Sequence, residues 1–460
     1  MTDSATAGDG GKGRDLTRTI ARRATALSFA DLPTDVVDVV GQCLKDWFAV
    51  TIAGTHEEPV QILADELPAT ADDAGQTLVG RGSRAGLLDA ALINGAASHA
   101  LDFDDVNLAM NGHPTVPVAA AVLALAELTG ASGREVIAAF AAGYETECRI
   151  GRLVGDAHYR AGFHATATLG SFGAAAACAR LLGLDAEATA TALGIAGTQA
   201  AGLKSMFGSM CKPLHAGRAA ANGLLAARLA ARGFTSRTDV LECAQGFAAT
   251  HGNACRPKAA LADPTGGFHL RHNLFKYHAA CYLTHSTIDA LQGLRRDAGI
   301  APDDVEAVTV QVDAGHLEVC AIAQPRTGLE TKFSLQHAAA FALCGDDTAR
   351  LDTYSDGNAA RADLVRLGGK VDIEPSDRPG TWARVEVTLH DGRRLRAAAD
   401  VGVPAVDLAA QGARIDAKFT ALVQPHLGPT GATELSAAID DLAQAPDIRT
   451  MLALSAAGRA

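Results

Sequence analysis

An almost unbroken series of helix-type patterns, from Asp15 to about Gly266, most constrains what this chain can fold into. Apolar residues recur at helical spacing, and short Gly-marked turns separate one segment from the next, as in a helical bundle. Hydrophobic residues make up 48% of the chain but aromatic residues only 5%, so Ala, Leu and Val must build the core. Because small side chains let helices approach closely, this composition favours a domain of helices packed on helices.

Local signals mark where individual helices begin. Ser132 and Glu135 have the spacing of a capping box, and an apolar run follows them. Asp185 follows Gly183 and has the position of an N-cap residue. These signals predict separate helices joined by short turns.

The pattern changes near Pro264. Residues 305–312 and 383–389 alternate with period two, and the second run leads into Asp391-Gly392, a hairpin signal. Helices are predicted in the same part of the chain at 281–294 and 334–343. This part of the sequence therefore predicts a smaller α+β unit.

From Ala405 the chain is helical again, so the predicted fold is mainly α. We expect a large all-α domain made from residues 15–268 and 405–460, with an inserted α+β domain at 269–404. Residues 1–14 are polar and Gly-rich without an apolar signal core, which predicts a disordered tail and no export.

Charge and cysteine usage narrow the class of protein. The net charge is −12 and no basic block offsets it, which argues against nucleic-acid binding. The nine cysteines include no C-x-x-C pair, as expected for reduced thiols in the cytoplasm. No run of about 18 uncharged apolar residues has the flanks of a membrane span. We expect a cytoplasmic protein that contacts neither nucleic acid nor membrane.

Two imidazoles and three carboxylates gather between two apolar, helix-like runs. The cluster consists of His99, Asp102, Asp104, Asp105 and His113. Polar groups at helix ends are unsatisfied and are often recruited by ligands. A capped, solvated turn would explain any one of these carboxylates, but the apolar runs pull the whole cluster toward the interior, where carboxylates need partners.

Three further segments carry candidate side chains. His164 and Lys212 each precede a probable helix, and Lys276 lies near the start of the first helix of the α+β unit. Each has a structural alternative: a helix cap or core residue for His164, a surface lysine for Lys212, and a snorkelling lysine for Lys276. Lys212 would lie at the positive end of a helix dipole, which is unfavourable unless an anion joins it.

The combination of Asp102, His113, His164, Lys212 and Lys276 suits one kind of chemistry. Small polycarboxylates need cations to neutralise their charge, and an acid–base pair to move a proton from a carbon next to a carboxylate. Histidine and lysine supply both functions, although composition alone does not select this reaction.

Six groups of residues follow one another along most of the chain in a recognisable order. They are Ala100-Leu101-Asp102-Phe103-Asp104-Asp105 with Gly112-His113-Pro114, Gly143-Tyr144-Glu145, Gly162-Phe163-His164, Lys212-Pro213-Leu214-His215-Ala216-Gly217, Thr284-His285, and Thr327-Gly328-Leu329-Glu330 with Lys332-Phe333-Ser334. In these motifs the chain resembles the MmgE/PrpD family. The resemblance implies a large all-α domain, a smaller α+β lid domain, usually a homodimer, and no metal or organic cofactor. Activities in the family include 2-methylcitrate dehydration, cis-aconitate decarboxylation and iminodisuccinate epimerisation.

The resemblance also implies site residues. The five residues named above as suited to polycarboxylate chemistry match the family's active-site positions, which predicts them as catalytic. The predicted substrate contacts are Tyr144, His215, Tyr277, His278 and Lys332.

Four departures leave the substrate open. Val106 stands where decarboxylase-type members tend to carry Thr, and the link from Asp105 to His113 is about one residue longer. The loop of dehydratase-type members, with Trp and Glu before its His-Pro, is replaced by residues 107–111. No clear equivalent of the decarboxylase tyrosine lies near residues 324–332.

The leading hypothesis is a cofactor-independent lyase that removes water or carbon dioxide from a small di- or tricarboxylate. An epimerase acting on an iminodisuccinate-like dicarboxylate is the closest rival, since both reactions begin with proton removal beside a carboxylate. A metal-dependent hydrolase that uses the cluster from His99 to His113 is more remote, because the spacing matches no strong metal motif. A helical binding protein without chemistry is the fourth alternative.

Overall fold

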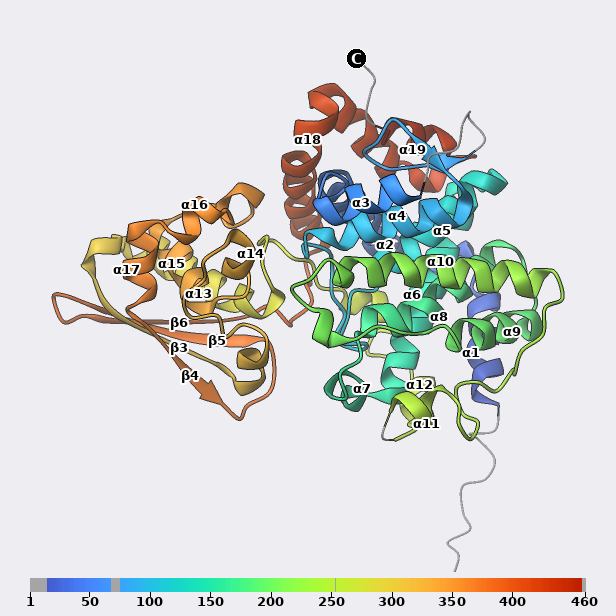
Figure 1. Ribbon diagram of the computed structural model, residues 1–460, viewed down its shortest axis with the longest axis horizontal. Helices are drawn as coiled ribbons and strands as arrows, with labels where there is room; N and C mark the ends of the chain where they lie inside the picture. Colours follow the sequence, from blue (N-terminus) through green and yellow to red (C-terminus); the bar gives the residue numbers. More distant parts are fainter. Residues whose placement is uncertain (1–14, 68–74, 253, 457–460) are drawn as a thin grey trace, which may run out of the picture. The chain divides into compact units, whose positions relative to one another are not determined.

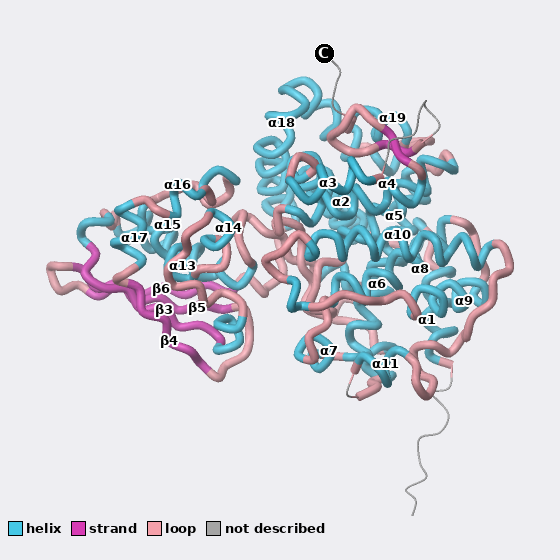
Figure 2. The backbone as a smooth tube through the Cα atoms, in the orientation of Figure 1, coloured by secondary structure: helices cyan, strands magenta, loops and turns pink. Residues whose placement is uncertain are grey.

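The computed structural model describes residues 15–67, 75–252 and 254–456, and the tail predicted at residues 1–14 lies outside them (Figure 1). The chain divides into two compact units, Met1–Asn273 with Asp407–Ala460, and Leu274–Val406. Helices account for most of the described residues, which confirms the mainly α prediction (Figure 2). In the part of the chain that the structure describes, no helix combines the length and the apolar character that crossing a membrane requires.

The first unit is built from helices, with one short antiparallel pair of strands. Its helices are α1 (Leu16–Ala26), α2 (Thr34–Gly54), α3 (Glu58–Glu66), α4 (Leu87–Ala100), α5 (Thr115–Thr129), α6 (Gly133–Val154), α7 (Asp156–Arg160), α8 (Ala165–Leu181), α9 (Ala186–Gly197), α10 (Cys211–Ala231), α11 (Phe247–His251), α12 (Pro257–Leu261), α18 (Leu408–Asp440) and α19 (Arg449–Leu454). The strands are β1 (Gln76–Thr77) and β2 (Arg84–Ala85).

Both predicted helix starts are confirmed. At α6, the Ser132 side chain accepts a bond from the Glu135 backbone, and the Glu135 carboxylate accepts one from Ser132 N at 2.8 Å. At α9, the Asp185 carboxylate accepts from Ala188 N at 2.8 Å. Each side chain satisfies backbone N–H groups that the first turn leaves without a partner.

Small residues let α4 and α10 cross closely. A Cβ atom placed on Gly95 of α4 would lie 2.9 Å from the Cα of Gly217 on α10. A Cβ atom on Gly217 would come within 2.2 Å of the Leu92 carbonyl oxygen. Helix α10 also packs on α8, and α8 packs on α6. This crossing fixes where the last turn of α4 lies relative to the first turn of α10.

Helix α18, from the C-terminal part of the chain, packs against α2. Lys45 of α2 lies 2.6 Å from Asp416 and 2.7 Å from Asp440, both on α18. Gly428 interrupts α18 with a φ of 71°, between Pro425 and Pro429. Chain segments far apart in sequence thus form the core of one unit.

The second unit is an α+β structure with one four-stranded sheet in the order β4-β3-β5-β6. Its strands are β3 (Val305–Asp313), β4 (Val371–Ser376), β5 (Trp382–Leu389) and β6 (Arg394–Asp400). Its helices are α13 (Tyr282–Ala298), α14 (Gly328–Thr331), α15 (Leu335–Cys344), α16 (Asp356–Ala359) and α17 (Ala362–Gly368). Strand β3 pairs parallel with β4 and antiparallel with β5, and β5 and β6 form an antiparallel pair.

The strands and helices predicted in this unit are confirmed. The two alternating runs are β3 and β5, and Gly392 takes a φ of 84° in the turn to β6, as the Asp391-Gly392 signal predicted. Helices α13 and α15 are the two helices predicted in this unit, with α13 before β3 and α15 between β3 and β4 in the chain, and they pack on the sheet (Figure 1). Helices α14, α16 and α17 and strand β4 were not predicted, because they are short or lack a clear period.

Candidate active site

The turn that follows α4 brings the predicted cluster together. Asp102 adopts a left-handed backbone conformation with a φ of 51°, which Asp tolerates better than most side chains. Leu101 and Phe103 on either side of it are buried in the core. The Asp102 side chain keeps 14% exposure whereas that of Asp104 keeps 2%. The two apolar neighbours therefore anchor the turn and hold its carboxylates at the edge of the core.

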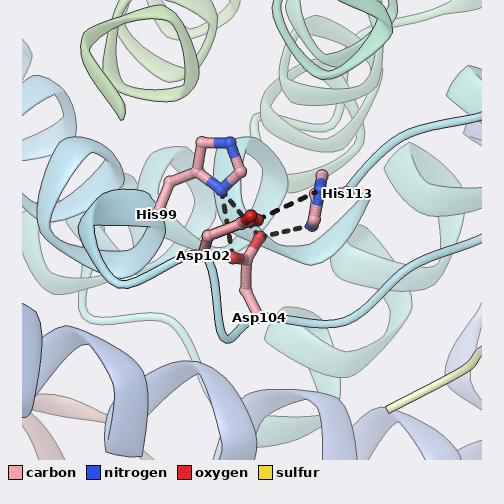
Figure 3. A group of neighbouring side chains, drawn as sticks. All are labelled: His99, Asp102, Asp104 and His113. Carbon is pink, nitrogen blue, oxygen red and sulfur yellow. Dashed lines mark hydrogen bonds and ion pairs between the residues drawn. The ribbon is translucent and has the colours of Figure 1, made fainter. Parts of the chain in front are cut away.

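Asp104 lies between two imidazoles. Nδ1 of His99 lies 2.9 Å and 3.0 Å from the two carboxylate oxygens of Asp104, and Nδ1 of His113 lies 2.9 Å from Oδ2 (Figure 3). Burial acts to raise the pKa of Asp104, but His113 and His99 outweigh it and hold this pKa well below its usual range. Asp104 is therefore an anion that can orient both rings through their Nδ1 atoms.

His99 is a buried neutral imidazole. Burial lowers its pKa to about 4, although the Asp104 carboxylate acts in the opposite direction. Its Nε2 atom has no hydrogen-bond partner among the described residues. The sequence pattern indicated His99 and Asp104 only as possible metal ligands; the structure places both at the centre of the cluster.

Lys212 enters the cluster from the first turn of α10. Its Nζ lies 2.8 Å from Oδ1 of Asp102, and Nε2 of His113 lies 3.8 Å from the same oxygen. The ammonium thus has its anion at the helix N-terminus, where a cation alone would be unfavourable. Asp102, His113 and Lys212, predicted from separate segments, lie together in the structure.

His164 lies at the N-cap of α8 and is buried. Its ring stacks on His99 with centroids 5.7 Å apart, and Phe207 packs edge-on at 4.9 Å. Its Nδ1 lies 3.0 Å from Nδ1 of His215, one turn along α10 from Lys212. Burial, followed by the neighbouring His99 and the charge of Lys212, holds the pKa of His164 well below its usual range.

Buried polar contacts hold the link between Asp105 and His113. Asn107 donates from Nδ2 to the hydroxyl of Tyr144 at 3.0 Å, and that hydroxyl donates to Asn273 Oδ1 at 2.7 Å. The backbone N–H of His113 donates to Thr166 Oγ1 at 3.1 Å. These contacts place His113, and they give the predicted substrate contact Tyr144 two protein partners.

Asp105 accepts hydrogen bonds from Thr115. The Thr115 hydroxyl donates to Asp105 Oδ2 at 2.5 Å. Burial raises the pKa of Asp105 to about 7; this bond opposes the change, and the charges of Asp46 and Asp104 add to it. Asp105 is thus a buried carboxyl group that supports the fold next to the cluster.

The remaining predicted residues belong to the second unit. Lys276 is buried in the segment before α13. His278 uses both ring nitrogens within its own unit, with Nδ1 2.7 Å from Thr348 Oγ1 and Nε2 3.0 Å from Asp289 Oδ1. Tyr277 is half-buried, and the ammonium of Lys332 lies 5.8 Å from the ring centroid of Tyr354. Their roles as catalytic or substrate-binding residues stay predictions.

Two supporting residues of the first unit escaped the sequence analysis. Phe207 packs against His164, and its ring centroid lies 5.2 Å from the ammonium of Lys212. Lys418 of α18 donates to the Phe103 carbonyl at 2.6 Å and pairs with Asp46 at 2.6 Å. Lys418 lies 315 positions from Phe103, so no local pattern could have revealed it.

The same cluster also has the composition of a metal site. One ligand atom from each of His99, Asp102, Asp104 and His113 lies within 4.8 Å of the others. A metal ion there would have to share Asp102 with the ammonium of Lys212, which repels cations. Nδ1 of each imidazole also faces Asp104, so a metal would compete with contacts already made.

Comparisons with known proteins identify relatives over most of the chain. The model of the MmgE/PrpD N-terminal domain matches residues 18–259, and that of the MmgE/PrpD C-terminal domain matches residues 278–444. A curated protein from Aspergillus terreus named cis-aconitate decarboxylase is 28% identical over 83% of this chain and 84% of its own length. Proteins of the same name from Homo sapiens and Mus musculus are 26% and 25% identical, over 82% of this chain and 82% and 80% of their own lengths.

Proposed function

The chain belongs to the MmgE/PrpD family, and we propose that it is a lyase that acts on a small di- or tricarboxylate without a metal or organic cofactor. Decarboxylation is the first reaction to test, because curated relatives carry the name cis-aconitate decarboxylase. The observation that carries the proposal is the set of Lys212, His113 and His164 around one buried anionic turn.

The geometry suits charge stabilisation beside a carboxylate. Lys212 supplies a buried ammonium at a helix N-terminus, and both features favour an anion. When carbon dioxide leaves, an electron pair remains on the substrate and spreads toward a neighbouring carboxylate. Fixed cations and hydrogen-bond donors stabilise such charge most where water is excluded.

His113 is the proposed proton carrier. Its Nδ1 lies beside the Asp104 carboxylate, so a proton taken up at Nε2 gives an imidazolium that this anion stabilises. In decarboxylation this proton comes from solvent, and the imidazolium donates it to the carbon that has lost carbon dioxide; in dehydration His113 takes it from the substrate carbon. Lys276 is the second proposed catalytic lysine, on the strength of its motif, and the second unit is proposed to act as a lid.

The test is direct incubation of the purified protein with cis-aconitate, citrate and 2-methylcitrate, followed by mass spectrometry. Loss of carbon dioxide from cis-aconitate supports decarboxylation, and loss of water from either hydroxy acid supports dehydration. Absence of both, with a correctly folded protein, contradicts the proposal for these substrates. The proposed homodimer is checked by sedimentation of the same sample.

Two rivals have their own tests. An epimerase incubated with iminodisuccinate in deuterium oxide would incorporate deuterium while the acid kept its composition. A metal-dependent hydrolase would lose activity on exhaustive chelation and regain it when a divalent metal is added.

A further inference from the structure

A single N–H bridges two neutral imidazoles, those of His164 and His215, at the edge of the cluster. Nδ1 of His164 and Nδ1 of His215 lie 3.0 Å apart. A neutral imidazole carries one N–H and one lone pair, so one ring must donate from Nδ1 and the other must accept there. The ring that accepts at Nδ1 carries its own proton on Nε2. The tautomers of His164 and His215 are therefore coupled.

The surroundings keep both rings neutral. Burial lowers the pKa of His164 well below its usual range, and burial together with Lys212 lowers that of His215. The groups that face His164 are the imidazoles of His99 and His215, the Phe207 ring, and the nearby charges of Lys212 and His113. None of these groups is an anion that would favour an imidazolium.

Nε2 of His164 is the atom left for a ligand. It is buried, and it has no hydrogen-bond partner among the described residues. His215 is half-buried, so water can satisfy its Nε2 in either tautomer. A lone pair on Nε2 of His164 would repel an anionic ligand, whereas an N–H there would bind it.

We infer that His215 is a positioning residue that donates its Nδ1–H to His164 and so holds His164 as a neutral Nε2–H donor toward the substrate. The inference rests on the proposed function and divides the roles of the two predicted catalytic histidines. A neutral imidazole that polarises a substrate oxygen is an established catalytic device.

His113 has the opposite arrangement. Its Nδ1 lies 2.9 Å from the Asp104 carboxylate, although the contact does not have the geometry of a hydrogen bond. The anion favours the proton of a neutral His113 on Nδ1, which leaves the lone pair on Nε2. His113 can therefore take up a proton and return it, while His164 binds developing negative charge and stays neutral throughout. The partner of each Nδ1, a carboxylate or an imidazole, sets this difference.

Nitrogen-15 NMR of histidine-labelled free protein reads the tautomers without any substrate. Two-bond correlations distinguish a protonated from an unprotonated ring nitrogen, and the His164→Gln variant identifies the His164 signals. We expect the proton on Nε2 of His164 and on Nδ1 of His215. A proton on Nδ1 of His164 overturns the inference whatever the enzyme's substrate proves to be.

Kinetics of two near-isosteric variants provide the functional test. His215→Asn keeps an N–H donor close to the position of Nδ1, whereas His215→Asp offers only an acceptor and forces the proton of His164 onto Nδ1. With a substrate identified by the incubations, we expect a loss in kcat/KM of no more than about 10-fold for Asn and on the order of 10²–10³-fold for Asp, the usual effect of losing one such donor.

A purely structural role for His215 predicts a different result. The two variants would then lose similar activity, and equal losses at equal thermal stability overturn the inference. The NMR spectrum of His215→Asp separates the tautomer from the added charge, since only a tautomer change moves the His164 proton to Nδ1. If no carboxylic acid is turned over, the proposed function fails while the tautomer experiment still gives its own answer.

Discussion

The ammonium of Lys212 lies 2.8 Å from the carboxylate of Asp102, whose backbone has a φ of 51°. One residue thus combines backbone strain with a buried ion pair, and such strain concentrates at functional sites. The pair gives the lysine at the N-terminus of α10 a counterion before any substrate arrives. It also means that either partner, removed alone, leaves a mostly buried charge without its counterion.

We expect Lys212→Met to lower kcat/KM by at least about 10²-fold, because a preorganised cation is lost from the site. It should also lower the thermal midpoint, since Asp102 loses its counterion. Asp102→Asn/Lys212→Met should recover stability without recovering activity, and Asn suits the left-handed backbone at position 102. Kinetics and thermal unfolding of both variants test these expectations. Full activity of Lys212→Met would show that Lys212 has no part in the mechanism.

Sequence patterns predicted the local elements of this fold well. Alternation marked β3 and β5, Asp391-Gly392 marked the hairpin turn from β5 to β6, and Ser132 with Glu135 marked the start of α6. Each of these signals acts over a few residues, through side-chain period or a backbone bond that the same segment satisfies.

The contacts within the candidate site could not be predicted in the same way. The motifs named Asp102, His113, His164 and Lys212, but not that His164 pairs with His215, 51 positions away. That pairing depends on how helices α8 and α10 pack, and hence on close approaches such as the one at Gly217. Tertiary packing determines which imidazole contacts which partner, and the spacing of motifs along the sequence does not predict that packing.

Asp105 gives a pH-dependent test of the core behind the site. Its folded-state pKa is about 7 against an ordinary value of 3.8, so its ionisation opposes folding. Ionisation of Asp105 therefore lowers the free energy of unfolding. This loss is absent near pH 4, grows as the pH rises toward 7 and is then constant. At about 1.4 kcal/mol per pH unit it amounts to at most roughly 4 kcal/mol.

The Asp105→Asn variant keeps an acceptor for the Thr115 hydroxyl and cannot ionise. We therefore expect its stability relative to wild type to increase steadily between pH 4 and 7. Urea unfolding of both proteins across this range measures the difference. A difference that stays flat with pH would mean that Asp105 has an ordinary pKa in the folded protein.

The crossing of α4 and α10 can be tested with a matched pair of glycines. Gly217→Ala places a methyl group 2.2 Å from the Leu92 carbonyl oxygen, so the helices must separate. We expect the free energy of unfolding to fall by about 1–3 kcal/mol. Turnover should also fall, because Lys212 and His215 move with α10. Gly41→Ala in α2 meets nothing within 4 Å and should stabilise by about 0.5–1 kcal/mol. Equal effects of the two changes on unfolding would show that the crossing is not tight.

Lys418 provides the last test, because it supports the Asp102–Asp104 turn from behind. Its ammonium binds the Phe103 carbonyl, pairs with buried Asp46, and lies 3.9 Å from the Phe103 ring centroid. Lys418→Met should cost about 3–5 kcal/mol, since Asp46 stays buried without its counterion, and Asp46→Asn/Lys418→Met should recover part of that loss.

The matched control is Lys45→Met, which also removes a buried lysine between α2 and α18. Its partners Asp416 and Asp440 are about 60% exposed, so they stay hydrated and the loss should be about 1 kcal/mol. Turnover should fall about 10-fold or more in Lys418→Met and stay unchanged in Lys45→Met, because only Lys418 contacts the turn. Unfolding and turnover measured side by side separate the two lysines. If both variants lose stability but keep full turnover, the position of the turn does not depend on α18.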